Sequence, residues 1–179
     1  MYWSDWNSPA KIEVANMDGT DRHIFVQGGG LTWPNGLCID YNAGKLYWAD
    51  ARTDLIEWVY LNGFNRSVLL GRLNHPFGLD VHNGFIYWTD WTSKDIKRAS
   101  ISDPTSVVVM RSQLEGLMEI RVYDPERQNG RLRVMEGDTC TFRHLKALRK
   151  VVVNPSGTAF YQVSTFVARL IIGDLLKDT

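Results

Sequence analysis

The sequence has few cysteines, no net charge and no long apolar run. Cys38 and Cys140 are too few for a disulfide scaffold, and their spacing is not that of a metal site. No stretch of eighteen apolar residues occurs, so no membrane-spanning helix is predicted. The first six residues lack the basic start and the apolar stretch of a signal peptide. Because the formal net charge is zero, neither nucleic acid nor an anionic membrane is expected as the main partner.

Motifs that carry catalysis are missing as well. The chain has no Gly-x-Ser-x-Gly nucleophile turn, no phosphate-binding loop and no pair of histidines at helical spacing for zinc. Its histidines are scattered. The sequence therefore predicts a protein that is not an enzyme and that needs no cofactor or metal. Cys38 lies in the apolar run at residues 36–39 and is expected to be a buried thiol.

A repeat dominates the first two-thirds of the chain. A tetrapeptide that starts with Tyr-Trp and ends with Asp occurs three times, at spacings of 45 and 40 residues. A second element, which ends in Gly-Leu, recurs out of phase with it. A period near 40 with only short apolar runs is typical of the four-stranded blades of a β-propeller. The tetrapeptides are Tyr2-Trp3-Ser4-Asp5, Tyr47-Trp48-Ala49-Asp50 and Tyr87-Trp88-Thr89-Asp90, and the second elements are Pro34-Asn35-Gly36-Leu37, Pro76-Phe77-Gly78-Leu79 and Leu114-Glu115-Gly116-Leu117.

Strands and turns can be assigned within each unit. Three dipeptides predict tight hairpins of type I′, in which both central residues need a positive φ: Asp18-Gly19, Asn62-Gly63 and Asn83-Gly84. A further turn is expected at residues 42–44, and no helical period is present before about residue 140. The expected strands are residues 12–17, 22–27, 37–40, 45–49, 55–61, 67–70, 79–81 and 85–89.

The tetrapeptide has a physical reason. Alternate side chains of a strand face opposite ways, so Tyr47 and Ala49 share one face while Trp48 and Asp50 share the other. Neighbouring blades cover both faces, and each aromatic ring can fill one gap between blades, which contributes about 2–3 kcal/mol per ring. A buried carboxylate must accept hydrogen bonds from backbone N–H groups. The Asp residues of the tetrapeptides are therefore expected to be structural rather than catalytic.

These motifs resemble the YWTD propellers of the low-density lipoprotein receptor-related family over about residues 1–128. Within that family the similarity is to the large receptors that serve as Wnt co-receptors or as the agrin receptor. The resemblance implies an all-β fold, namely about three four-stranded blades from the C-terminal half of one six-bladed propeller. It also implies a fragment of a receptor ectodomain at the extracellular face of the plasma membrane. The stretches that carry it are Trp33-Pro34-Asn35-Gly36-Leu37, Lys45-Leu46-Tyr47-Trp48-Ala49-Asp50, His75-Pro76-Phe77-Gly78-Leu79, Leu114-Glu115-Gly116-Leu117-Met118-Glu119-Ile120 and Pro125-Glu126-Arg127-Gln128.

Residues 129–179 depart from the family. A cysteine-rich module of the epidermal-growth-factor type normally follows such a propeller, but this segment holds only Cys140. It is basic, with eight Lys/Arg against four Asp/Glu, whereas residues 1–128 hold 12 against 16. We therefore expect a partial propeller at 1–128 and an unassigned mixed tail at 129–179. Within the tail the sequence predicts strands at 151–153 and 159–163, a turn at 154–157 between them, and a short amphipathic helix at 163–176.

Candidate contact residues lie next to the expected strands. Trp33 and Asn35 precede one inner strand, His75 precedes the next, and Trp6 and Trp91 directly follow a tetrapeptide. In the receptors that this sequence resembles, the corresponding Trp and Asn line a site on the top face for short Asn-x-Ile peptides of ligands. The resemblance thus implies a ligand-binding site made of these five residues. A loop Trp that closes a blade and a structural His remain alternatives for two of them.

The resemblance also bears on modification and partners. Asn65-Arg66-Ser67 is an acceptor pattern for N-glycosylation beside an expected hairpin. The implied partners are secreted proteins, either Wnt-pathway ligands or antagonists, or agrin-like proteins, with no nucleic acid and no membrane insertion by this segment. Two other functions stay open. A propeller-type metal-dependent hydrolase would need Asp, Asn, Glu and His side chains that converge at the channel, and a structural spacer module would have no ligand of its own.

Overall fold

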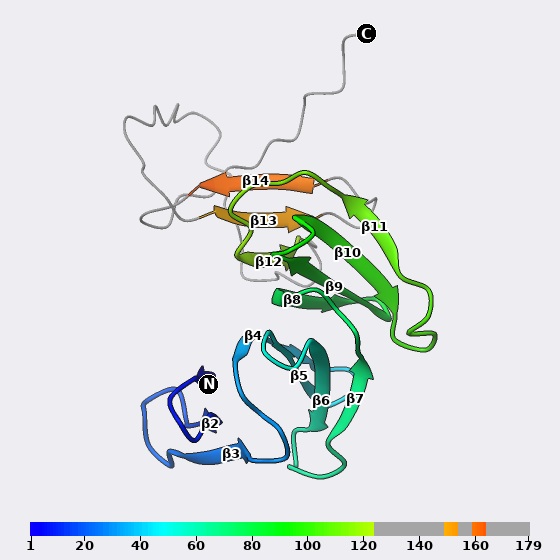
Figure 1. The fold of residues 1–179 in the computed structure, drawn as a ribbon. Helices are drawn as coiled ribbons and strands as arrows, with labels where there is room; N and C mark the ends of the chain where they lie inside the picture. Colours follow the sequence, from blue (N-terminus) through cyan, green and yellow to red (C-terminus); the bar gives the residue numbers. More distant parts are fainter. Residues whose placement is uncertain (124–148, 154–158, 164–179) are drawn as a thin grey trace, which may run out of the picture.

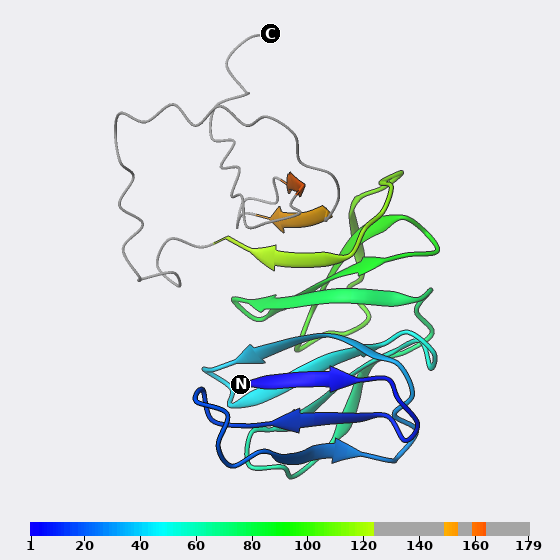
Figure 2. The same ribbon diagram turned by 90° about the vertical axis from the view of Figure 1, so that its left-hand side faces the viewer.

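The computed structural model of the chain describes residues 1–123, 149–153 and 159–163. All regular secondary structure in these ranges is β-strand, which confirms the all-β fold. Four sheets follow one another in chain order and lie side by side as layers (Figure 1 and Figure 2). The first strands of the second, third and fourth sheets contact one another in turn, as expected for the inner strands of successive propeller blades.

The second and third sheets are complete blades in which each strand pairs antiparallel with the next. The first sheet has three strands, and the fourth combines one blade strand with two strands of the tail. The first sheet holds β1 (Tyr2–Asp5), β2 (Lys11–Val14) and β3 (His23–Gln27); the second holds β4 (Pro34–Asp40), β5 (Lys45–Asp50), β6 (Leu55–Tyr60) and β7 (Ser67–Leu70); the third holds β8 (Pro76–His82), β9 (Phe85–Asp90), β10 (Asp95–Ser100) and β11 (Val108–Arg111); the fourth holds β12 (Glu119–Val122), β13 (Arg149–Val153) and β14 (Ala159–Val163).

The first sheet differs from the expected four-stranded blade in one respect. Its strand β1 carries the first Tyr-Trp tetrapeptide, just as β5 and β9 carry the second and third. The three strands of this sheet are therefore the counterparts of β5, β6 and β7. No described residue occupies the inner position beside β1, so this blade has three strands rather than four.

The second and third tetrapeptides each contribute to two layers of core. Tyr47 is buried with Trp88 between the second and third sheets. Trp48 is buried between the first and second sheets, on the opposite face of the same strand. Tyr87 repeats the position of Tyr47 one sheet further along, against the inner strand of the fourth sheet. The predicted alternation is thus confirmed, because the two rings of a tetrapeptide fill the gaps on opposite faces of their sheet.

The Gly-Leu elements mark where inner strands approach most closely. A Cβ atom on Gly36 would lie 2.7 Å from the backbone oxygen of Phe77, and one on Gly78 would overlap the backbone oxygen of Met118. A side chain at either position would force the strands apart, so the repeat of glycine follows from the narrow centre of the propeller.

The third Gly-Leu element lies elsewhere than the sequence suggested. The indole N–H of Trp6 donates to the backbone carbonyl of Pro34, at the start of β4. The indole N–H of Trp91 donates in the same way to Leu117, which is therefore the counterpart of Pro34. The predicted element at Gly116-Leu117 is three residues too early. Gly116 has a φ of 61° and belongs to the loop before the inner strand, where a glycine serves backbone conformation and not close strand packing.

One of the three predicted type I′ hairpins is confirmed and two are wrong. Asn83 and Gly84 both have positive φ, 46° and 76°, and form the two-residue connection between β8 and β9. Gly63 has a φ of 85°, but Asn62 is not in the positive region, and the same holds for Gly19 and its preceding residue. These two dipeptides sit in longer loops. In the loop after β6, the side chain of Asn62 accepts the backbone N–H of Phe64, as in an Asx turn.

The two predicted strands of the tail are confirmed as β13 and β14, which pair antiparallel with each other. β13 pairs parallel with β12, whereas neighbouring strands within the complete blades run antiparallel. The predicted turn at 154–157 lies outside the described residues, as does the predicted helix beyond Val163, the last residue of β14. Within the described ranges, no helix is long and apolar enough to cross a membrane.

Candidate functional site

The exposed aromatic residues gather at one end of the second and third sheets. Strand β4 begins where β5 ends, since Pro34 pairs with Asp50, and β8 begins where β9 ends, since Pro76 pairs with Asp90. Residues just before an inner strand and just after a tetrapeptide are therefore brought to the same end. We call this the aromatic end, and we call the opposite end, where Asn83 and Gly84 lie, the turn end.

Trp33, His75, Trp91 and Phe77 form a continuous aromatic row at the aromatic end. The ring centroids of Trp33 and His75 lie 6.5 Å apart in an edge-to-face arrangement. The rings of His75 and Trp91 are stacked with centroids 5.7 Å apart, and those of Phe77 and Trp91 are stacked at 5.1 Å. Trp33 is 41% exposed and Trp91 45% exposed. The row therefore combines mutual ring contacts with faces that remain open to solvent.

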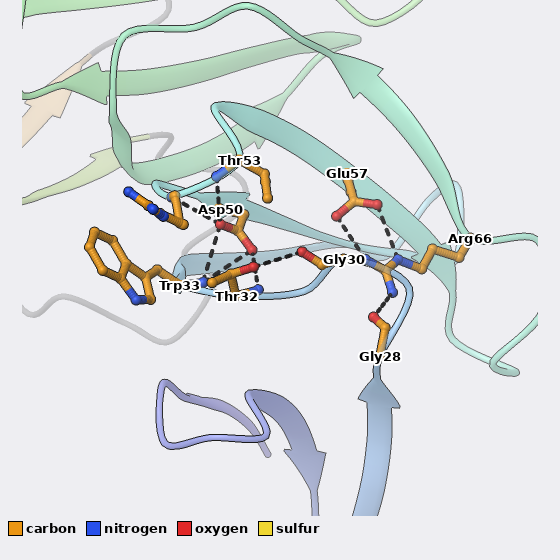
Figure 3. Close-up of polar contacts among 9 residues, drawn as sticks. Gly28, Gly30, Thr32, Trp33, Asp50, Thr53, Glu57 and Arg66 are labelled. Atoms are coloured by element: carbon orange, nitrogen blue, oxygen red, sulfur yellow. Dashed lines mark hydrogen bonds and ion pairs between the residues drawn. The ribbon is translucent and has the colours of Figure 1, made fainter.

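The backbone of the second sheet holds Trp33 in place through Asp50. The buried carboxylate of Asp50 accepts the N–H groups of Thr32 at 2.7 Å and of Trp33 at 3.2 Å (Figure 3). It also accepts the N–H groups of Arg52 at 3.0 Å and Thr53 at 3.1 Å. A fully buried anion is tolerated here because backbone donors surround it. Its geometry is that of a structural clamp between two loops.

Asp90 makes a related arrangement in the third sheet, with two backbone donors and a lysine. Its carboxylate accepts the N–H groups of Asn74 at 3.2 Å and Ser93 at 3.0 Å. The Nζ atom of Lys97 lies 3.0 Å from the same carboxylate and forms an ion pair with it. The loop that contains His75 is thus held by Asp90 as the loop that contains Trp33 is held by Asp50.

Trp33 and His75 occupy the same place in successive sheets. The backbone oxygen of Trp33 accepts the N–H of Ala51, and that of His75 accepts the N–H of Trp91, each at 3.1 Å. The residue after the tetrapeptide is therefore Trp91 in the third sheet but Ala51 in the second. Trp6 and Trp91 each donate a hydrogen bond from the indole to the next sheet, but Ala51 has no indole. At the junction of the second and third sheets, the edge-to-face contact between Trp33 and His75 takes the place of that hydrogen bond.

Trp6 lies apart from the aromatic row. Its indole N–H donates to the backbone oxygen of Pro34 at 2.7 Å, which joins the first sheet to the second. It is 54% exposed. The sequence placed Trp6 and Trp91 together because both follow a tetrapeptide, but the structure separates their surroundings. Trp91 contacts His75 and Phe77, whereas Trp6 lies one sheet away.

Asn35 is not at the surface. It is 9% exposed, and its Oδ1 atom is buried with no hydrogen-bond partner among the described residues. The predicted role of Asn35 as a direct contact therefore requires its side chain to turn outward. Its counterpart in the third sheet is Phe77, which stacks on Trp91. Phe77 was not predicted as a contact residue, although its position in the Gly-Leu element identifies it as the counterpart of Asn35.

Arg52 adds a positive charge to the row and was also missed. Its guanidinium carbon lies 5.5 Å from the centroid of the Trp33 ring, within range of a cation–π interaction, and the residue is exposed. Its neighbour Asp54 accepts the backbone N–H of His75 at 3.1 Å, so this loop spans two sheets. The signal in the sequence was the position of Arg52 two residues after a tetrapeptide, where the chain leaves the buried strand.

A clasp of glutamate and arginine holds the outer strands. The guanidinium of Arg66 donates to both carboxylate oxygens of Glu57, at 3.1 and 2.9 Å, and to the backbone oxygen of Gly28 at 2.7 Å (Figure 3). Arg22 and Glu13 form the same paired contact in the first sheet at 3.0 Å. Hydrogen bonds from Arg22 lower the pKa of the Glu13 carboxyl below its usual value. These charged groups are thus occupied in holding strands together.

The described residues contain no group of three or more His, Cys, Asp or Glu side chains that could hold a metal ion. Burial raises the pKa of Tyr47 to about 12, so its hydroxyl stays protonated near neutral pH. A cleft of about 540 Å³ is lined by residues 39–43 and 81–84 at the turn end, away from the aromatic row.

Comparisons with known proteins match this geometry. The family model "Low-density lipoprotein receptor repeat class B" matches residues 1–41. The human "Low-density lipoprotein receptor-related protein 5-like protein" is 37% identical over 130 residues, which cover 72% of this chain and 51% of the relative. A chain in the crystal structure of a nidogen/laminin complex is similar with a TM-score of 0.55 and 34% identity, covering 63% of this chain and 42% of that chain. This chain thus spans about half the length of the curated relative that it matches.

Proposed function

Because this chain belongs to the low-density lipoprotein receptor class B, or YWTD, repeat family, we propose that its aromatic end binds a secreted protein outside the cell. The propellers of this family are ligand-binding modules and not enzymes. The partner that we propose is a Wnt-pathway ligand or antagonist, or an agrin-like protein. Trp33, His75 and Trp91 supply the contact surface.

The observation that carries the proposal is the aromatic row itself. Three aromatic rings from two sheets remain partly exposed while they contact one another, so they are already ordered before a partner arrives. Preordered aromatic side chains lose little conformational entropy on binding, and Trp is common among the residues that dominate binding energy. The solved relative in a nidogen/laminin complex supports a protein as the class of partner.

The five predicted contact residues do not have equal roles in this proposal. Trp33, His75 and Trp91 form the surface, with Phe77 beside them. Asn35 contributes after its side chain turns outward, because its unpaired Oδ1 atom can then accept a hydrogen bond from the partner. Trp6 lies at the margin, where its indole already bonds to Pro34.

The test is a binding measurement on the whole chain. Purified Wnt-pathway ligands and antagonists, agrin and laminin are passed over the immobilised protein in surface plasmon resonance. Trp91→Ala is expected to weaken the captured partner about tenfold or more, since a central Trp contributes about 2 kcal/mol or more. Tyr41→Ala is the matched control, because Tyr41 is 78% exposed in a loop of the turn end. Equal affinities for the two variants, with unchanged melting curves, would contradict the binding role of the aromatic end and leave the structural spacer module as the function.

A further inference from the structure

Asn65 lies at the turn end of the second sheet, in the loop between β6 and β7. The backbone N–H of Leu61 donates to Gly44 at 2.8 Å, which fixes this loop against the turn between β4 and β5. Asn65 is exposed and has a φ of 58°. An Asn tolerates this left-handed conformation better than most residues. Asn65 is thus open to solvent.

The two neighbours of Asn65 are held on either side. The backbone oxygen of Phe64 accepts the N–H of Tyr60 at 3.1 Å. On the other side, Arg66 is anchored by Glu57 and by the backbone of Gly28 (Figure 3). Within the part of the chain that the structure describes, the loop is therefore held by the neighbours of Asn65 and not by its side-chain amide. Ser67, the third residue of the acceptor pattern, is also exposed, at the start of β7.

The surface around Asn65 combines a strand edge with exposed apolar side chains. β7 is the outer strand of the second sheet, and no described strand pairs with its outer edge, so that edge can pair with a strand of another molecule. Phe64 is 70% exposed and Val68 is 50% exposed, which leaves apolar side chains on both sides of Asn65. A bulky hydrophilic group at this position would cover that edge.

We propose that Asn65 carries an N-linked glycan that shields the edge of β7 and leaves the aromatic end free. This inference rests on the extracellular placement in the proposed function, and it adds a modification site and the end of the propeller at which it lies. The 179 residues contain no other Asn-x-Ser/Thr pattern with a residue other than Pro in the middle.

The chemistry is a transfer from an activated sugar. The Nδ2 atom of Asn65 forms a bond to the anomeric carbon of an oligosaccharide that is carried on a lipid pyrophosphate. The bond between that carbon and the pyrophosphate oxygen breaks, and the lipid pyrophosphate leaves with the electron pair. The amide gives up one proton to a base of the transferase, and no group is oxidised or reduced. The product keeps one amide N–H.

The first sheet provides a natural control. Arg22 contacts Glu13 as Arg66 contacts Glu57, so Asp21 is the counterpart of Asn65. Asp21 has a φ of 54°, close to that of Asn65. Asn65→Asp therefore places in this loop a residue that its counterpart already accepts, and it removes the glycan without straining the backbone.

The experiment expresses the full chain behind a heterologous secretion signal in mammalian cells. The secreted protein is expected to shift in mobility by one glycan when an amidase releases N-linked sugars, with Asn65 converted to Asp in the peptide mass spectrum. Asn65→Asp and Ser67→Ala are expected to abolish the shift, and Ser67→Thr is expected to keep it. A paired change, Asp21→Asn with His23→Ser, is expected to add a second glycan. A secreted wild-type chain with unmodified Asn65 would overturn the proposal.

Two further measurements test the glycan separately from the proposed function, and its shielding role separately from its presence. Asn65→Asp is expected to bind a partner of the aromatic end as the wild type does. If the wild-type chain carries the glycan but binds none of the tested partners, only the proposed function is contradicted. Light scattering is expected to show faster association of Asn65→Asp, and Val68→Lys in the same chain is expected to suppress it. Association at the wild-type rate would overturn the shielding role.

Discussion

The buried carboxylate of Asp50 accepts a hydrogen bond from the backbone N–H of Trp33 at 3.2 Å (Figure 3). One residue of this pair belongs to the repeated tetrapeptide of the core and the other to the exposed aromatic row. A related link occurs in the third sheet, where Asp90 accepts the backbone N–H of Asn74, the residue before His75. The core of the second and third blades therefore fixes the position of the surface residues that we propose to contact a partner.

Asp50→Ala is expected to destabilise the protein by about 3 kcal/mol or more, because it leaves buried backbone donors without an acceptor. Asp18→Ala is the control. Asp18 is exposed and accepts the N–H of Thr20, so its loss is expected to cost much less stability than the loss of Asp50. Urea denaturation of both variants measures the difference. Similar midpoints for Asp50→Ala and the wild type would contradict the clamp.

Arg66→Ala is expected to cost more stability than Arg22→Ala. The side chain of Arg66 is 22% exposed and joins the second sheet to Gly28 of the first, whereas that of Arg22 is 60% exposed and bonds to its own sheet. We expect a loss of about 2 kcal/mol for Arg66→Ala and a smaller loss for Arg22→Ala. Thermal unfolding of the two variants checks the order, and a reversed order would show that the link between sheets contributes little.

Gly78→Ala is expected to disturb the centre of the propeller. The added Cβ would meet the backbone of β12, which cannot move as a flexible side chain does, and such overpacking costs about 1–3 kcal/mol. Gly71→Ala is the control, because there the nearest atom is a side-chain methyl group of Leu55 at 3.2 Å and the φ is not positive. The measurement is the denaturant midpoint. Equal midpoints would mean that the inner strands can separate freely.

Acid is expected to weaken the first sheet through Glu13. Arg22 lowers the pKa of Glu13 in the folded protein, so folding favours the ionised form. The stabilisation is fully present above the pKa of the unfolded chain, 4.5, and is lost as the pH falls below it toward the folded value. Melting temperatures from neutral pH down to about pH 3 should therefore fall less steeply for Glu13→Gln than for the wild type. Glu115→Gln, in an exposed pair with Lys94, is expected to follow the wild-type slope.

Arg52 is expected to select the charge of the partner. Its exposed guanidinium beside Trp33 favours an acidic side chain or a carbonyl group on a bound peptide loop. Arg52→Glu should weaken a captured partner about tenfold or more and reduce the salt dependence of its association rate, whereas Arg72→Glu, an exposed charge change outside the row, should have a smaller effect. Surface plasmon resonance at two salt concentrations measures both. Equal losses for the two variants would assign the effect to net charge alone.

The repeat alone was sufficient to predict the blades and the packing of the tetrapeptide. A strand points alternate side chains to opposite faces, so the order Tyr47-Trp48 by itself places one ring in each gap. The glycine at Gly36 or Gly78 was visible as a motif, but its reason, the contact between neighbouring inner strands, came from the structure. The third copy at Gly116 was misplaced because a glycine that serves a positive φ looks the same in sequence as one that serves close packing.

The tertiary structure decided which residues face solvent at the aromatic end. Asn35 and Phe77 occupy equivalent positions, yet the amide is buried and the ring joins Trp91. Trp6 and Trp91 follow the same motif, yet only Trp91 joins the row. Sequence fixes the direction of a side chain within its own strand through local geometry. Exposure also depends on which residues of the neighbouring sheet cover that side chain. These residues differ between junctions, because Ala51 of the second sheet stands where the first and third sheets have a tryptophan.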